Sequence, residues 1–337
     1  MTSRKLVYKT LEFENKDGRV PRQMWLLPWA ETNHGSMVEK IRREFAADIV
    51  SAPNILRKET IAKGNQYGIG EYIDEWGCKF DNIHEGIIGE VKEPLVKDEE
   101  WTDMDHVHIP VEWLDFDVDA VNRYCRSTDK FVVSGCCPRP FEQMQFIRTT
   151  EELYVDLFEP PANMIKFMNK MHTFYCDLLE KWAKTDVDAL TFMDDWGSQK
   201  SLLISPLKWD EYFRPMYKDY ISIAKKYGKK TIMHSDGNTL DIYPRMIELG
   251  LDAFNTQIFC IGLENLEPFK GQITFWGEID RQHLLPEGSP QDIKAAVKEV
   301  YQKLWFDGGC IAQCEFGPGA KPENVYAVFE AWDSVIE

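Results

Sequence analysis

A regular alternation of short apolar runs with longer helical patterns, from about residue 130 onward, constrains the fold of this chain most strongly. Strands that alternate with helices predict parallel βαβ units, because two parallel strands must be joined by a long crossover connection. The predicted strands of this region are 131–135, 188–193, 231–234, 252–255, 273–276 and 310–313. Helical periodicity is clearest at 163–184, 208–226, 290–305 and 322–336.

The region before residue 130 adds two strands to this series. A strand at 47–50 follows a helix at 37–45, and a further strand is expected within 72–91. Eight strands with interleaved helices, and no linker or low-complexity tract, predict one α/β domain over residues 1–337, a closed TIM (β/α)8 barrel. We expect an N-terminal extension and a β-hairpin insertion at 68–94, where glycines punctuate the chain. A doubly wound open sheet is the alternative.

Composition and charge exclude several classes of protein. The chain has 39 Lys+Arg against 56 Asp+Glu, a net charge of −17, which disfavours binding to nucleic acids and to anionic membranes. Hydrophobic residues make up 44% of the sequence, enough for a large core and too many for a disordered chain. With no apolar leader and no CxxC pair among its eight cysteines, the protein is expected to be cytoplasmic, with reduced thiols.

Polar side chains follow five consecutive predicted strands. Active sites of TIM barrels lie at the carboxyl ends of the strands, so these positions are the first candidates for function. Two adjacent carboxylates exceed what a helix cap needs, and we expect acid, base or electrostatic roles there. The candidate catalytic residues are Asp194, Asp195 and Glu278, and the candidate substrate-binding amides are Gln199 and Gln257.

A histidine, a carboxylate and a thiol could form a metal site at the same end. His234 and Asp236 are two residues apart at a strand end, where side chains i and i+2 point the same way. Cys314 ends the last predicted strand. Three protein ligands with an open fourth position are the pattern of catalytic zinc. The structural alternatives are a hydrogen-bonded histidine and a cysteine that belongs to the core.

With these motifs, the chain resembles the uroporphyrinogen decarboxylase superfamily along nearly all its length. The superfamily fold is a TIM barrel, and its two main branches are decarboxylases of haem biosynthesis and cobalamin-dependent methyltransferases. The matching stretches are Phe192-Met-Asp-Asp-Trp-Gly-Ser-Gln199 with 202–206, Met233-His-Ser-Asp-Gly-Asn238, Trp276-Gly-Glu-Ile-Asp280 and Pro322-Glu-Asn-Val325.

The resemblance favours the methyltransferase branch. The decarboxylase signature carries arginines that hold substrate carboxylates, and here Pro28 and Trp29 stand where its Arg-Gln pair would be. The methyltransferases carry zinc on an H-x-C…C motif, onto which His234 and Cys314 map. Asp236 replaces the middle cysteine, which predicts a more Lewis-acidic zinc suited to activating an oxygen.

The resemblance therefore implies transfer of a methyl group from a small methylated donor, best an aryl methyl ether, to cob(I)alamin. Zinc, or a general acid among the candidate carboxylates, would neutralise the leaving oxygen. The chain lacks the D-x-H-x-x-G cobalamin signature, so the cofactor is expected on a separate corrinoid protein. In this superfamily, apolar faces of the barrel helices often pair the chains into homodimers.

Four tryptophans in predicted loops are the aromatic candidates for lining a flat pocket, and the alternative is that they are core. They are Trp25, Trp29, Trp76 and Trp196. Two other functions stay open. One is a metal-free, decarboxylase-like enzyme in which Asp194, Asp195 and Asp236 act on a small carboxylate or ring substrate. The other is a non-catalytic subunit that docks a corrinoid protein.

Overall fold

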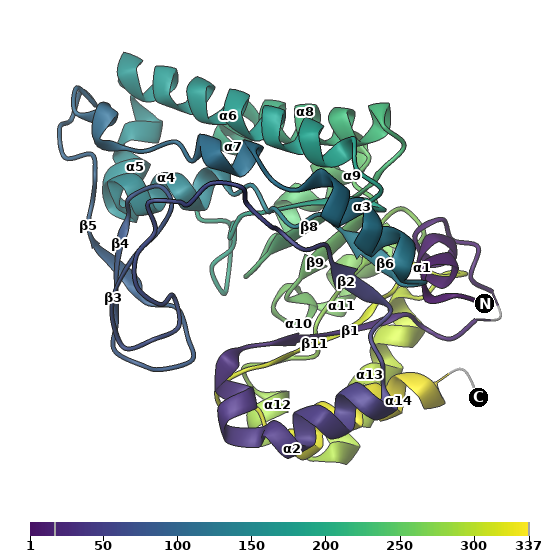
Figure 1. Cartoon of the computed structure of the whole chain (residues 1–337). Helices are drawn as coiled ribbons and strands as arrows, with labels where there is room; N and C mark the ends of the chain where they lie inside the picture. Colours follow the sequence, from purple (N-terminus) through teal and green to yellow (C-terminus); the bar gives the residue numbers. More distant parts are fainter. Residues whose placement is uncertain (17, 336–337) are drawn as a thin grey trace.

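A curled sheet of six parallel strands is the centre of the computed structural model, which describes residues 1–16 and 18–335 (Figure 1). Its order is β10-β9-β8-β7-β6-β2, and each strand is parallel to its neighbours. These strands carry the predicted apolar runs of the chain. Their bounds are β2 Ile49–Ser51, β6 Phe131–Val133, β7 Ala189–Met193, β8 Lys230–Ser235, β9 Ala253–Thr256 and β10 Thr274–Phe275.

Two further strands, β1 (Arg22–Leu26) and β11 (Ala312–Phe316), pair in parallel as a separate sheet. An isolated bridge between Phe275 and Cys310 connects the β11 end of this pair to β10. On the β1 side, the backbone N–H of Asp48 donates to the carbonyl of Arg22 at 2.9 Å. The predicted α/β architecture with a curled parallel sheet is thus confirmed, whereas the two sheets are not one continuous, closed eight-stranded ladder.

The predicted eighth strand was placed in the wrong part of the chain. Residues 72–91 supply no parallel strand; the region 68–94 holds the antiparallel sheet β3 (Gly70–Ile73), β4 (Lys79–Asn82) and β5 (Glu90–Glu93), to one side of the parallel strands (Figure 1). The eighth parallel strand is β1. Its partner β11 lies almost 300 residues away in sequence, so no local pattern predicts that the two strands pair.

Helices surround the parallel strands and cover their outer face (Figure 1). The predicted helix 208–226 is two helices, because Pro215 lacks the N–H that would continue α7 and starts α8 instead. The last residue of the predicted helix 322–336 lies outside the described residues. The bounds are α1 Ser3–Leu11, α2 Pro28–Glu44, α3 Val118–Ser127, α4 Pro140–Arg148, α5 Thr150–Phe158, α6 Ala162–Ala183, α7 Pro206–Tyr212, α8 Arg214–Lys226, α9 Tyr243–Leu249, α10 Ile258–Ile261, α11 Leu263–Leu266, α12 Leu284–Glu287, α13 Pro290–Leu304 and α14 Pro322–Ser334.

The core divides into two clusters according to which face of a strand a residue occupies. The inner cluster joins the concave faces of the strands, for example Ala189, Ile232 and Ala253, and α1 adds Val7 and Leu11 to it. The outer cluster joins the opposite strand faces to the helices. Successive residues of a strand therefore alternate between the two environments. Within the described residues, no helix is both long and apolar enough to cross a membrane.

Candidate active site

Asp195, His234 and Asp236 meet at the carboxyl ends of β7 and β8. One ligand atom from each residue lies within 4.8 Å of the others. The Nε2 atom of His234 is 3.6 Å from a carboxylate oxygen of Asp195 and 3.6 Å from one of Asp236. All three are in phase with the inner face of their strands. Ala189 of β7 and Ile232 of β8 pack in the inner cluster; Asp195 comes six residues after Ala189, and His234 and Asp236 come two and four residues after Ile232.

The surroundings of His234 orient its ring toward the carboxylates. Its Nδ1 atom is hydrogen-bonded to Oδ1 of Asn255, whose own amide donates to the carbonyl of Trp276. That bond fixes Nδ1 as the donor and leaves the Nε2 lone pair facing Asp195 and Asp236. The indole of Trp25 packs 5.0 Å from the imidazole ring, between centroids.

One carboxylate oxygen in this cluster has no partner. Oδ1 of Asp236 is buried, and it finds no hydrogen-bond donor among the described residues. A buried acceptor left without a donor is costly, and a cation beside it would remove the cost. One imidazole and two carboxylates are ligands that zinc and other divalent ions accept. The residues present therefore fit a divalent metal ion with an open position.

Two neighbouring loops hold the cluster together by close backbone contact. A Cβ atom on Gly237 would lie 2.0 Å from the carbonyl oxygen of Gly197, and Gly197 would be blocked in the same way. The N–H of Gly197 donates to the carbonyl of Asp236 at 3.1 Å. Only glycine, which has no Cβ, allows this close contact, and the contact joins the loop that carries Asp195 to the loop that carries Asp236.

A single arginine connects three carboxylates beside this cluster. Arg281 binds the second carboxylate oxygen of Asp236, and it lies 3.2 Å from Glu278 and 3.0 Å from Glu315. Burial raises the pKa of Glu278 to about 8, although Arg281 opposes the shift. Glu278 is therefore mostly protonated at neutral pH and can donate a proton.

The predicted ligand Cys314 does not join the cluster. Cys314 belongs to the outer core cluster and is fully buried, whereas Gln313 and Glu315 occupy the opposite face of β11. Its thiol contacts the carbonyl of Glu315 at 3.7 Å, and burial raises the thiol pKa. The third candidate ligand is Asp195 instead.

Asp194, a predicted catalytic residue, is fully buried and engaged in structural hydrogen bonds. Its carboxylate accepts hydrogen bonds from the N–H groups of Phe141 and Glu142, at 3.0 and 2.7 Å, and from the hydroxyl of Tyr217. The two N–H groups belong to the first turn of α4, so Asp194 caps that helix from a distant loop. Burial raises its pKa, and these hydrogen bonds counter that effect.

Three of the four candidate tryptophans lie outside the cavity that the concave face encloses. Trp76 and Trp196 are fully buried in the core; Trp196 stacks on Phe141 and donates to the hydroxyl of Tyr217. Trp29 lies on α2 and packs against His34. Only Trp25 lines the cavity, and it does so from strand β1 rather than from a loop.

The cavity has a volume of about 380 Å³ and lies against the His234 cluster. Its wall is mainly apolar and aromatic, with a few amide, hydroxyl and thiol groups and no carboxylate among the described lining residues. The lining residues are Gln23, Trp25, Ser51, Ala52, Val133, Ser134, Gly135, Cys136, Cys137, Thr191, Phe192, Met193, Ile232, His234, Asn255 and Trp276.

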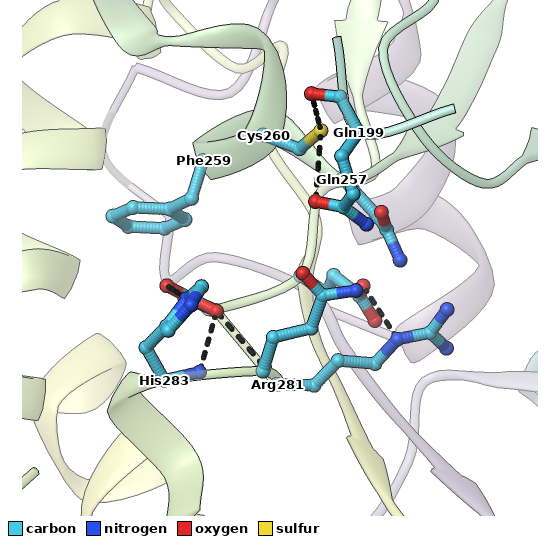
Figure 2. Close-up of a pocket in the computed structure, with 9 residues that line it drawn as sticks. Gln199, Gln257, Phe259, Cys260, Arg281 and His283 are labelled. Atoms are coloured by element: carbon cyan, nitrogen blue, oxygen red, sulfur yellow. Dashed lines mark hydrogen bonds and ion pairs between the residues drawn. The ribbon is translucent and has the colours of Figure 1, made fainter. Parts of the chain in front are cut away.

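A smaller pocket of about 70 Å³ contains Gln199, Gln257, Glu278 and Arg281 (Figure 2). Figure 2 shows Phe259 and Cys260 on one side of this pocket and Arg281 and His283 on the other. The predicted amides thus share a pocket with the predicted acid, next to the carboxylate cluster.

Sequence reasoning missed several residues of the site. Arg139 and Glu142 come after β6, so the rule that identified His234 would have found them, whereas Glu315 lies within β11, beyond the end of the predicted strand 310–313. Glu142 pairs with Arg139 at 3.0 Å, and burial raises its pKa against the effect of Arg139. Gln23 could not be found this way, because it lies within the unexpected strand β1.

Comparison with known proteins defines the class of protein. The family described as Uroporphyrinogen decarboxylase (URO-D) matches residues 72–335. A methyltransferase from Methanosarcina mazei has a TM-score of 0.70 at 17% identity, covering 99% of this chain and 98% of its own. The fold is therefore of the TIM-barrel-like α/β class found in this family. This chain belongs to the uroporphyrinogen decarboxylase family.

Two more distant structures also align. Xylanase 10B from Thermotoga petrophila has a TM-score of 0.45 at 13% identity, covering 100% of this chain and 98% of its own. A B12-independent methionine synthase from Shewanella has a TM-score of 0.44 at 12% identity, covering 95% of both chains. No curated protein matches the sequence.

The cap formed by Asp194 predicts a loss of stability without a loss of metal ligands. Replacing Asp194 with Ala leaves two buried N–H groups of α4 and the hydroxyl of Tyr217 without their acceptor. We expect the free energy of unfolding to fall by about 2–3 kcal/mol, measured by denaturant titration. Asp195→Ala, at a more exposed carboxylate, should change it by less than about 1 kcal/mol. Equal losses would contradict the structural role of Asp194.

Proposed function

We propose that this protein is a methyltransferase that moves a methyl group from a small methylated donor, best an aryl methyl ether, to the cob(I)alamin of a separate corrinoid protein. The observation that carries the proposal is the His234 cluster at the wall of an apolar, aromatic cavity. Such a cavity suits a flat, weakly polar donor. The likeness to the methyltransferase from Methanosarcina mazei supports it. We also infer that the two sheets complete one barrel around this cavity.

His234, Asp195 and Asp236 would hold zinc in the proposed enzyme. The ion would supply Lewis acidity toward the oxygen that leaves the methyl group. The protein's own contribution begins with orientation: Asn255 fixes the imidazole, and Arg281 holds the other oxygen of Asp236. The apolar wall binds the donor and keeps water from its methyl carbon.

The transfer itself is a nucleophilic displacement. The C–O bond breaks with its electron pair going to the oxygen, while the methyl carbon accepts the electron pair of the reduced cobalt. Glu278, mostly protonated at neutral pH, lies in the smaller pocket and is linked to Asp236 through Arg281; in the proposed mechanism it is the source of the proton that the leaving phenolate takes up. Trp25 and Trp276 pack edge to face, with ring centroids 6.3 Å apart, and together form an aromatic part of the cavity wall.

A single-turnover assay tests the proposal. Reduced corrinoid protein is mixed with the enzyme and with methoxyarenes, glycine betaine or methylamines, and methylation of the corrinoid is followed spectroscopically. We expect methylation with a methoxyarene, and its loss in His234→Ala, with His106→Ala at an exposed histidine as the control. If no donor methylates the corrinoid, the proposed activity is wrong and a role in docking the corrinoid protein remains.

Metal analysis distinguishes the two candidate ligand sets. Protein purified without chelator should contain about one zinc per chain if three ligands converge. We expect that zinc to be lost in His234→Ala and in Asp195→Asn, and to be retained in Cys314→Ser, because the thiol lies on the other face of its strand. Loss of zinc in Cys314→Ser with full retention in Asp195→Asn would restore the ligand set inferred from sequence.

The raised pKa of Glu278 predicts a pH dependence. The acid form is present below about pH 8 and is lost above it, so the rate of methyl transfer should fall on the alkaline side. Glu278→Gln cannot donate a proton and should lower the rate about 100-fold and remove this alkaline limb. An unchanged limb in Glu278→Gln would assign the titration to another group.

A metal-free, decarboxylase-like activity is the second candidate, and Arg281 is the observation that favours it. This guanidinium contacts Asp236, Glu278 and Glu315, and it would balance part of the negative charge of the site without a metal. Absence of zinc from active protein, with release of CO₂ from a carboxylate substrate, would favour this function.

A further inference from the structure

A second group of metal-ligand side chains lies in the outer layer of helices. Helix α6 carries His172 and Cys176, which are four residues apart and therefore share one side of the helix. Helix α8 packs beside α6 (Figure 1), and it brings Asp219 to the same place. One ligand atom from each of the three residues lies within 4.8 Å of the others. The proposed methyl transfer uses none of them.

The two helices direct these ligand atoms toward one nitrogen. The Nε2 atom of His172 is 2.9 Å from a carboxylate oxygen of Asp219 and 3.6 Å from the sulfur of Cys176. Around a tetrahedral zinc ion, ordinary bond lengths put nitrogen and sulfur ligands about 3.6 Å apart, and nitrogen and oxygen ligands about 3.4 Å apart. The sulfur therefore has the required separation already, and the exposed carboxylate has to move by only about half an ångström.

The position of the thiol favours a metal ion over a simple hydrogen bond between the two helices. His172 and Asp219 alone would form such a bond, and Cys176 adds nothing to it. Among the described residues, however, the only polar contacts of the Cys176 sulfur are the two ring nitrogens of His172. Imidazole, thiolate and carboxylate are the three ligand types that zinc accepts in proteins.

Exposure and charge also suit a cation that arrives from solvent. The side chain of Asp219 is 57% exposed, and within the described part of the chain no lysine or arginine forms an ion pair with it. Burial and three nearby carboxylates raise the pKa of the Cys176 thiol to about 12. The carboxylates are Asp219, Asp177 and Glu180. A cation bound here would therefore meet negative charge and would displace the thiol proton to solvent.

We propose that His172, Cys176 and Asp219 form a second zinc site, separate from the His234 cluster, with water as the fourth ligand. Binding forms a Zn–S bond and releases the proton of the Cys176 thiol to solvent, and no electron is transferred. The ion clamps α6 to α8, the helices that lead into β7 and β8. Because the site is open to solvent and has to deprotonate a thiol, it binds zinc more weakly than the interior cluster and fills when metal is added.

Cobalt(II) is a probe that reports a thiolate ligand directly. Cobalt bound to a thiolate absorbs in the near ultraviolet by charge transfer from sulfur, whereas the imidazole and carboxylates of the His234 cluster give no such band. We expect metal-free wild-type protein to develop this band on titration with Co²⁺, and added Zn²⁺ to abolish it by competition. Cys176→Ser should lose the band, and Cys260→Ser, at another partly exposed cysteine, should keep it.

The histidine provides an independent variant. His172→Ala should weaken the binding of Co²⁺ at least about tenfold, because the loss of a direct ligand costs no less than the loss of a hydrogen-bond partner of a ligand. His106→Ala, at an exposed histidine, is the matched control and should leave the affinity unchanged.

Three outcomes would overturn the inference. They are the absence of the band from wild-type protein in excess Co²⁺, its persistence in Cys176→Ser, and unchanged affinity in His172→Ala. The first is read from wild-type protein, so the proposal stays testable even where a variant fails to fold. None of the readouts involves a corrinoid or a methyl donor, so they leave the proposed methyl transfer to its own assay.

Discussion

Strand pleating is the constraint on which the rest of this structure depends. Neighbouring residues of a strand face opposite sides, so a position one residue away from a site residue lies among helices. At the end of β7 this separates Asp195, beside His234, from Asp194, which caps α4. At β11 it places Cys314 in the helical layer and Glu315 against Arg281. Adjacent residues of one strand thus have different roles: one belongs to the candidate site, and the next stabilises the packing of the helices.

Local patterns predicted most of the parallel strands and the end of the strands where the polar residues gather. They identified His234, Asp236 and Asp195 because each lies at the end of an apolar strand or directly after it. They could not decide between adjacent candidates, since the phase of a strand depends on which neighbours it meets. The chemistry of Cys314 suits a metal ligand, but Ile311 in the inner cluster puts Gln313 and Glu315, not Cys314, on the inner face.

The strand β1 marks the other limit of local reasoning. Its five residues mix polar and apolar types, and its pairing with β11 joins the two ends of the chain. Such a pairing depends on long-range topology, and a local sequence pattern contains no information about contacts between distant segments. Because β1 is not predicted, Gln23 is not identified as a cavity residue and Trp25 is predicted to lie in a loop. Arg139 follows β6, so the pattern of polar residues after strands is sufficient to identify it.

The contact between Gly197 and Gly237 has a consequence for how this site can diverge among descendants of the chain. Neither position can gain a side chain while the other loop stays in place, because each backbone fills the space that the other's Cβ would need. Single substitutions there would move both carboxylates at once. Substitutions that adapt the protein to new substrates are therefore expected among the residues that line the cavity. A mutant library for directed evolution should vary those residues and keep these two glycines unchanged.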